Sequence, residues 1–252
     1  MTDPLDDVGM LDVDGTVTQL ETALSAAGNA DRAAQEKRYL KSTRTHYGVG
    51  VPLVRSTVRT ALRDLGPLSA EDAVALAGQL WQQPVHELRT AAVEVLAASV
   101  RRLRMVDLAV VERMLREAGT WALADPLATA VVAPVVEREL DRDPGLRALL
   151  DQWAQDDDFW VRRAALLALL PGLRAGAGHF ELFARYAEWM LDEREFFIRK
   201  AIGWVLRDTA KRRPELVADW VRRHRARLSR LSLREAVKYL PPEDRADLLA
   251  GG

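Results

Sequence analysis

A short pattern recurs along this chain at intervals of about 36 residues: an apolar residue, an arginine, a variable residue, an alanine and a second apolar residue. Clear copies begin at Leu88, Val161, Ile198 and Leu233, a degenerate copy at Leu123 and an earlier weak copy at Val54. Repeats of this length stack into solenoids, in which equivalent positions point the same way. The pattern therefore predicts a repetitive fold and one face shared by the equivalent residues.

The variable position of the pattern carries side chains of very different chemistry. Its occupants are Ser56, Thr90, Asp125, Arg163, Lys200 and Glu235. Large rings precede it in three successive repeats, at Trp121, at Phe159 and Trp160, and at Phe196 and Phe197. A carboxylate, two cations and several rings on one concave face indicate a binding or catalytic surface.

Helical spacing of apolar residues runs through nearly the whole sequence. Apolar side chains recur every three or four residues, as in Val54, Val58 and Leu62, and no long segment alternates with period two. Glycine and proline interrupt the spacing at regular intervals, for example at Gly66-Pro67 and Pro241-Pro242. We expect an all-α, HEAT-like solenoid of about six helical pairs. Residues 14–250 are predicted to form one domain, and the acidic residues 1–13 a disordered terminus.

Composition excludes several classes of protein. The chain has 252 residues and no cysteine, so it has no disulfide and no thiolate metal site. Its 4 histidines are scattered without ligand spacing, so we expect neither a zinc enzyme nor any metal or cofactor. No apolar run approaches the roughly 18 residues of a membrane span, and the first residues lack the features of a signal peptide. A cytoplasmic, bacterial, monomeric protein without membrane association is predicted.

The formal net charge of -1 conceals a strong asymmetry. Residues 1–31 carry only acids, whereas residues 194–238 hold far more arginine and lysine than acid. A local basic block of this kind is typical of nucleic-acid binding. The alternative is an ordinary solvated helix face.

The segment 196–212 is the most informative predicted helix. At 100° per residue, its apolar residues lie on one side and an aromatic and basic group on the other. The apolar residues are Ile198, Ile202, Val205 and Leu206; the aromatic and basic group is Phe197, Lys200, Trp204, Arg207 and Lys211. We expect the second side to lie outside the core, and Gly203 to permit a close approach to the backbone.

Two further features of the sequence have alternative interpretations. Trp121 and Asp125 lie one helical turn apart, where a ring and a carboxylate can hold a cationic centre. Alternatively, Trp121 is structural and Asp125 caps a helix, because Pro126 disfavours helical geometry before it. Arg163 could clamp a phosphate or form an interhelical salt bridge.

These motifs, in this order, resemble those of the AlkD-type DNA alkylation repair glycosylases over residues 39–240. The motifs are Tyr39-Leu40-Lys41, Gly48-Val49, Leu80-Trp81, Glu87-Leu88-Arg89, Trp121 with Asp125, Trp160-Val161-Arg162-Arg163 and the run from Phe196 to Arg207. The resemblance implies a HEAT-like superhelix with a concave basic face that grips double-stranded DNA. It implies a monofunctional glycosylase that hydrolyses the N-glycosidic bond of cationic N3- or N7-alkylated purines, bulky adducts included.

The resemblance also assigns roles to particular residues. Trp121 and Trp204 would pack on the deoxyribose, and Asp125 would stabilise the cationic sugar and orient water. DNA contacts would come from Tyr39, Lys41, Arg163, Phe196, Phe197, Lys200, Arg207 and Lys211. The alternative function is a non-catalytic HEAT-repeat protein that binds adducts or branched DNA, or a protein scaffold.

Overall fold

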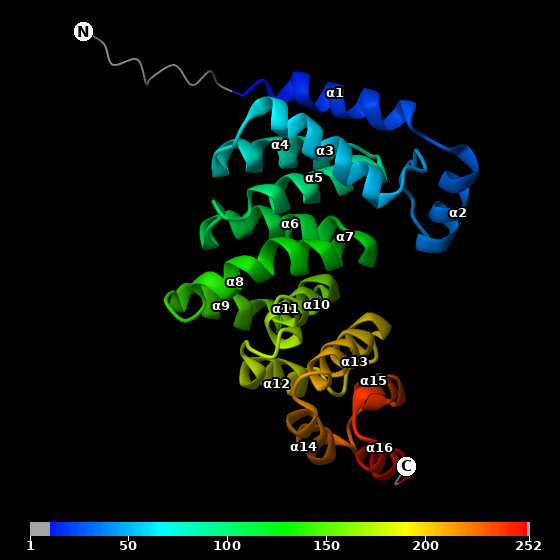
Figure 1. The fold of residues 1–252 in the computed structure, drawn as a ribbon, viewed down its shortest axis with the longest axis vertical. Coiled ribbons are helices and arrows are strands. Elements are labelled where there is room, and N and C mark those ends of the chain that lie inside the picture. The colour runs from blue at the N-terminus through cyan, green and yellow to red at the C-terminus, as the bar shows by residue number, and fades with distance from the viewer. Residues whose placement is uncertain (1–10, 251–252) are drawn as a thin grey trace. The chain divides into compact units, whose positions relative to one another are not determined.

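The computed structural model describes residues 11–250, and nearly all of them are helical (Figure 1). Within these residues the extended structure is limited to one isolated parallel bridge between Thr45 and Val85. The chain divides into two compact units, with the boundary between Leu103 and Arg104. The predicted all-α, HEAT-like fold is confirmed, whereas the assignment of residues 14–250 to a single domain stays a prediction.

The first unit consists of five helices and the loops between them. They are α1 (Val13–Ala26), α2 (Ala30–Leu40), α3 (Val51–Leu65), α4 (Ala70–Gln82) and α5 (His86–Ser99). Helix α5 packs against α3 and α4, and α1 packs against α3 and α4 (Figure 1). Leu24, Val54, Leu76 and Leu88 are fully buried between them. The apolar periodicity of the sequence therefore forms the core of this unit.

The second unit contains the later copies of the repeat. Its helices are α6 (Leu108–Glu117), α7 (Trp121–Pro126), α8 (Ala133–Glu139), α9 (Pro144–Trp153), α10 (Phe159–Leu167), α11 (Leu170–Arg174), α12 (Phe180–Trp189), α13 (Phe196–Ala210), α14 (Pro214–His224), α15 (Arg230–Ala236) and α16 (Pro242–Ala250). Short 3-10 turns cover Met105–Asp107 and Val237–Tyr239. Helix α10 packs against both α7 and α13, and α13 packs closely against α15 (Figure 1).

Short polar side chains begin many of the helices. Asn29, Ser69, Asp158 and Ser229 each accept a hydrogen bond from a backbone N–H in the first turn of the helix that follows. Such a cap satisfies one of the donors that the first turn leaves unpaired. Local sequence thus determines where these helices begin.

Only the end of the predicted disordered terminus, residues 1–13, lies among the described residues. Residues 1–10 lie outside the described residues, but the carboxylate of Asp12 accepts a hydrogen bond from Gly15 N–H at 2.9 Å and Val13 begins α1. Val13 is therefore helical, after an aspartate cap, and the disorder predicted for the preceding residues stays a prediction.

Pro126 does not interrupt the helix that contains it. Helix α7 continues through one π-helical segment, Leu127–Val132, directly into α8. Proline removes one backbone donor, and a π-helical turn is a common way to accommodate such a gap in the hydrogen-bond ladder. Asp125 is therefore inside a helix and Thr120 is the cap, so the alternative that Asp125 caps a helix is wrong.

No helix among residues 11–250 is long and apolar enough to cross a membrane.

Candidate functional site

Asp125 and Arg163 form a buried, two-pronged ion pair in the second unit. Arg163 Nε lies 2.7 Å from Asp125 Oδ1, and the adjacent guanidinium nitrogen lies 2.8 Å from Oδ2. Asp125 is 8% exposed and Arg163 is 3% exposed. A pair with this bidentate geometry is held firmly, and removal of one partner would leave a buried, uncompensated charge. Of the two interpretations of Arg163, the structure contains the interhelical ion pair, and DNA contact by Arg163 stays a prediction.

Arg163 also connects the helices on either side of α10. Besides its bonds to Asp125 of α7, its remaining guanidinium nitrogen donates to the backbone carbonyl of Phe197 on α13. The guanidinium carbon lies 5.9 Å from the centre of the Phe197 ring. One side chain thus sets the positions of the carboxylate and of the helix that carries Trp204.

Trp121 lies at the start of α7, one turn before Asp125, and 37% of its surface is exposed. A core tryptophan would be almost completely covered, as Trp153 and Trp220 are. The ring of Trp121 therefore lies at the surface. One turn later on α7, the carboxylate of Asp125 points to the buried Arg163.

The aromatic side chains that precede the variable position form a cluster. Phe159 and Trp160 of α10 contact each other at 4.6 Å between ring centres, and Trp160 contacts Phe197 at 4.8 Å. Phe196 stands edge-on to Phe197 at 5.4 Å and is largely exposed. Trp160 is buried. The cluster therefore has a buried base and presents Phe196 to solvent.

The two sides of α13 differ as the periodicity predicts. Ile198, Ile202, Val205 and Leu206 are buried, as predicted for the core side. On the same helix, a Cβ added to Gly203 would lie 2.7 Å from the Cβ of Glu235 and 3.1 Å from the Cα of Ser232. Gly203 therefore permits the close approach of helix α15.

The other side of α13 carries cations that are paired with acids. Lys200 Nζ lies 2.7 Å from Glu235 Oε1, and Arg207 donates to the other oxygen of Glu235. The hydrogen bond from Lys200 is the main reason that the pKa of Glu235 lies below its usual range. Lys211 Nζ lies 3.0 Å from Asp208 and 4.8 Å from the centre of the Tyr239 ring. The basic side of α13 is thus partly neutralised and only half exposed.

Asp208 is a residue of this side that the sequence analysis missed. It is buried, yet Lys211, Arg174 and the Nε1–H of Trp204 all donate to its carboxylate. Burial alone would raise the pKa of Asp208, but the hydrogen bonds from Lys211 and Arg174 outweigh burial and lower it. Asp208 follows Trp204 by four residues, which places the two side chains next to each other on the helix, and this spacing could have identified Asp208 from the sequence.

Two pairs of variable positions from neighbouring repeats are in contact in the second unit. Asp125 pairs with Arg163, and Lys200 pairs with Glu235. The four charges are therefore paired with one another, and a face shared by all the variable positions stays a prediction.

The first unit contains the remaining predicted residues, Tyr39 and Lys41. Tyr39, in the last turn of α2, is 74% exposed, and Lys41 ends that helix in the left-handed conformation. The loop that follows packs closely against the backbone of Asn29 at Gly48, where an added Cβ would lie 2.1 Å from the Asn29 carbonyl oxygen. Buried Glu87 accepts hydrogen bonds from the N–H groups of Gly48 at 2.7 Å and of Val49 at 3.1 Å. These contacts explain why the Gly48-Val49 and Glu87 motifs occur together.

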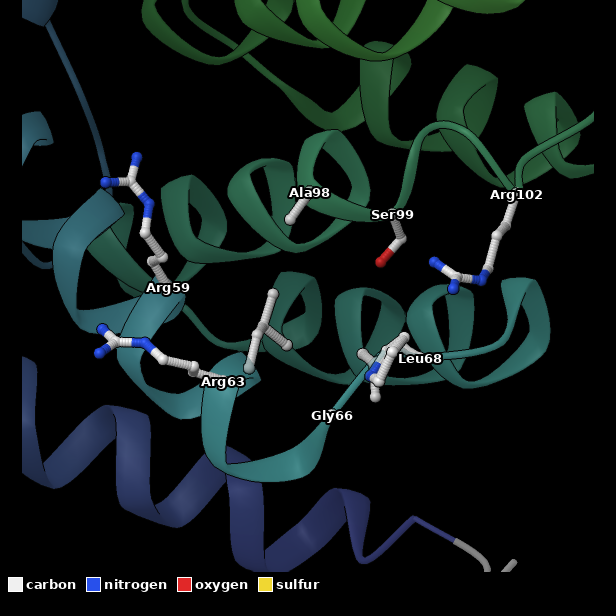
Figure 2. Close-up of a pocket in the computed structure, with 9 residues that line it drawn as sticks. Arg59, Arg63, Gly66, Leu68, Ala98, Ser99 and Arg102 are labelled. Atoms are coloured by element: carbon white, nitrogen blue, oxygen red, sulfur yellow. The ribbon is translucent and has the colours of Figure 1, made fainter.

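A shallow hollow in the same unit was not predicted from the sequence. It lies between α3 and α5 and is lined by Arg59, Arg63 and Arg102, with Ser99 and Leu68 at its floor (Figure 2). Arginine side chains suit an anionic group such as phosphate. No carboxylate lines it.

Comparison with known proteins gives a consistent result. A family model described as "DNA alkylation repair enzyme" matches residues 20–240. No curated protein matches the sequence significantly. Three solved structures are similar in fold, with identities below 25%.

The first is a "predicted DNA alkylation repair enzyme" from Enterococcus faecalis, with a TM-score of 0.75 and 23% identity over 85% of this chain and 97% of that chain. AlkD2 from Streptococcus mutans has a TM-score of 0.62 and 17% identity over 90% and 99% of the two chains. The protein smu.31 from Streptococcus mutans UA159 has a TM-score of 0.57 and 19% identity over 76% and 98%.

Proposed function

Because the chain belongs to the DNA alkylation repair enzyme family, we propose that it is a monofunctional glycosylase. Its substrate is a cationic N3- or N7-alkylated purine in double-stranded DNA. It hydrolyses the bond between the base and the deoxyribose and leaves an abasic site. The observation that carries the proposal is the pair of Trp121 and Asp125 on one helical turn, with Arg163 holding the carboxylate.

The chemistry of the substrate matches this set of residues. An alkylated purine that already carries positive charge leaves as a neutral base, so no strong general acid is needed. As the glycosidic bond breaks, positive charge develops on the sugar. Water then forms the new bond to the sugar carbon and gives up a proton. A fixed carboxylate lowers the energy of such a charge, and ring faces attract cations.

In this proposal Asp125 stabilises the cationic sugar and orients the attacking water, and Trp121 and Trp204 pack on the deoxyribose. Arg163 is a positioning residue, since its bidentate bonds fix the orientation of the Asp125 carboxylate. The Trp121 side chain is 37% exposed. DNA contacts come from Lys200, Arg207 and Lys211, and also from Tyr39, Lys41, Phe196 and Phe197.

One observation favours the alternative of a non-catalytic DNA-binding protein. The carboxylate of Asp125 is largely buried, and both of its oxygens already accept hydrogen bonds from Arg163. A carboxylate used in this way serves to hold helices together. A binder of this kind would recognise alkylated DNA without forming abasic sites.

The formation of abasic sites on DNA that contains N7-methylguanine separates the two functions. We expect the wild-type protein to form them, and Asp125→Asn to lose about 10²–10³-fold in rate while it keeps its DNA affinity. Asp141→Asn is the matched control, because its side chain is 78% exposed and lies outside the site. The assay should run well below the melting temperature of each variant, since Asp125→Asn weakens a buried ion pair.

Two outcomes would contradict the glycosylase. The wild-type protein could bind N7-methylguanine DNA and form no abasic sites, as the alternative requires. Asp125→Asn could also excise at the wild-type rate, in which case the ion pair has only a structural role.

A further inference from the structure

A buried group of metal-binding side chains lies in the first unit, at the junction of α2, the loop 41–50 and the start of α5. Glu36 comes from α2, His46 from the loop and Glu87 from α5. One ligand atom of each lies within 4.8 Å of the others. These residues have no part in the proposed glycosylase reaction.

His46 is the feature that requires a ligand. Its side chain is 9% exposed, and neither ring nitrogen has a hydrogen-bond partner among the described residues. A neutral imidazole carries one donor and one acceptor, and buried polar groups are almost always paired. An imidazole with an unused lone pair in a closed site is the commonest metal ligand in proteins.

The two carboxylates complete the site. Glu87 accepts two backbone hydrogen bonds at Oε1 and one, from Tyr47 at 3.0 Å, at Oε2. Its orientation is therefore set in advance, as in metal sites whose ligands are held by outer hydrogen bonds. Glu36 uses one oxygen for Arg32, at 2.7 Å, and has a second oxygen for an ion. Two carboxylates also balance the charge of a dication.

We propose that Glu36, His46 and Glu87 bind one divalent transition-metal ion, with Zn²⁺ the best match to one imidazole and two carboxylates. Ligand atoms about 2.1 Å from a tetrahedral ion lie roughly 3.4 Å apart, so the group must contract slightly on binding. Glu36, which is partly exposed, is free to make that movement. The fourth position is open to water.

The neighbouring His86 supports the same site. Its ring stacks on that of His46 at 4.6 Å between centres, nearly parallel, and its Nδ1 also lacks a hydrogen-bond partner among residues 11–250. It therefore fixes the plane of the His46 ring. An ion at this point would fasten the C-terminal part of α2 to the loop and to α5. This proposal is independent of the glycosylase activity.

Zinc titration of the full-length protein after chelator treatment and dialysis tests the proposal. By calorimetry and native mass spectrometry we expect one equivalent of Zn²⁺ per chain, and a rise in melting temperature on its addition. Mg²⁺ and Ca²⁺ should not compete, because they prefer sites made wholly of oxygen. Absence of stoichiometric Zn²⁺ binding, or equal binding of Mg²⁺, would overturn the proposal.

Variants locate the ion. Glu36→Gln and His46→Gln should each weaken Zn²⁺ binding by more than about 100-fold, since loss of an outer-shell partner alone costs about 10–100-fold. His179→Gln is the matched control, because His179 is a partly exposed histidine in the other unit. Circular dichroism verifies the fold of each variant. If His46→Gln does not fold, the Zn²⁺ affinity of Glu36→Gln alone tests the site. Equal affinity in wild type and in Glu36→Gln would mean that zinc binds elsewhere.

Discussion

At the scale of single residues, the candidate site consists of charged groups that hold one another in place. Asp125 is paired with Arg163, and Glu235 is paired with Lys200 and Arg207. A buried pair such as that of Asp125 and Arg163 adds little net stability, but it fixes the directions of the side chains involved. A carboxylate with one fixed orientation is what the proposed reaction needs.

Trp204 provides a test of the surface that the proposal uses. Its ring is half-buried and hydrogen-bonded to Asp208 at 3.2 Å. We expect Trp204→Ala to reduce excision strongly and to cost less stability than the roughly 3–5 kcal/mol of a fully buried tryptophan. Single-turnover excision and thermal melting measure the two effects.

The control for Trp204→Ala is Trp189→Ala, which removes an exposed ring on α12. Its excision rate should equal that of wild type. If Trp204→Ala melts far below the wild type and excises normally when folded, the ring belongs to the core and not to the DNA-binding face.

Asp208 gives a prediction about pH. Its pKa in the folded protein lies below the value of about 3.9 in the unfolded chain. Its stabilisation is therefore complete above that value and is lost as the pH falls through the lower, folded pKa. We expect Asp208→Asn to melt below wild type at neutral pH, with a difference that shrinks below about pH 4.

Thermal melting between pH 3 and pH 7 measures this difference. Asp192→Asn is the control, because Asp192 is an exposed acid whose partner, Arg227, is also at the surface. Exposed pairs contribute little, so its melting temperature should stay near that of wild type throughout. A constant gap for Asp208→Asn across the range would contradict the assignment.

At the scale of helices, the close packing of α13 against α15 depends on a glycine, which has no side chain. Gly203 lies where the backbone of α15 comes closest. A glycine inside a helix costs about 1 kcal/mol relative to alanine. The contact between the two helices offsets this cost.

Gly203→Ala should therefore destabilise the protein by about 1–3 kcal/mol from overpacking, reduced by the gain in helix propensity. Gly78→Ala is the matched control, because Gly78 of α4 has nothing within 4 Å of an added Cβ. It should stabilise by about 0.5–1 kcal/mol. Denaturant unfolding measures the stability of both variants. A Gly203→Ala variant as stable as Gly78→Ala would contradict the close packing of α13 against α15.

At the scale of the whole molecule, the distribution of charge sets the expected mode of DNA binding. The net charge is only -1, so long-range attraction must come from the basic segment 194–238. Within that segment Glu235 neutralises part of the charge of Lys200 and Arg207. We therefore expect Glu235 to limit non-specific binding of DNA.

Salt titrations of DNA binding test this balance. Lys200→Ala and Lys211→Ala should each lower the slope of log K against log salt by about 0.9 for B-DNA. Glu235→Gln should bind undamaged DNA more tightly and with a steeper slope, because it releases two cations. Glu181→Gln, which removes an exposed acid on α12, is the control. An unchanged slope in Lys200→Ala, Lys211→Ala and Glu235→Gln would place the DNA on another surface.

The sequence by itself determined the architecture and the candidate surface. Apolar residues at helical spacing must be buried along one stripe, so the period alone predicted the helices and the core side of α13. The repeat aligned Asp125 with Arg163 and Lys200 with Glu235. Trp121 and Asp125 lie on one helical turn, so their proximity also follows from spacing.

Only the tertiary structure decided which charged side chains pair with one another. The pairing of Asp125 with Arg163 spans 38 residues, and that of Tyr47 with Glu87 spans 40. His46 and His86 look scattered in the sequence, yet their rings stack. Helical periodicity fixes the direction of a side chain around its own helix but not which side chain of another helix meets it. That choice depends on packing between elements, and it paired Arg163 with Asp125 and brought His46 to Glu36 and Glu87.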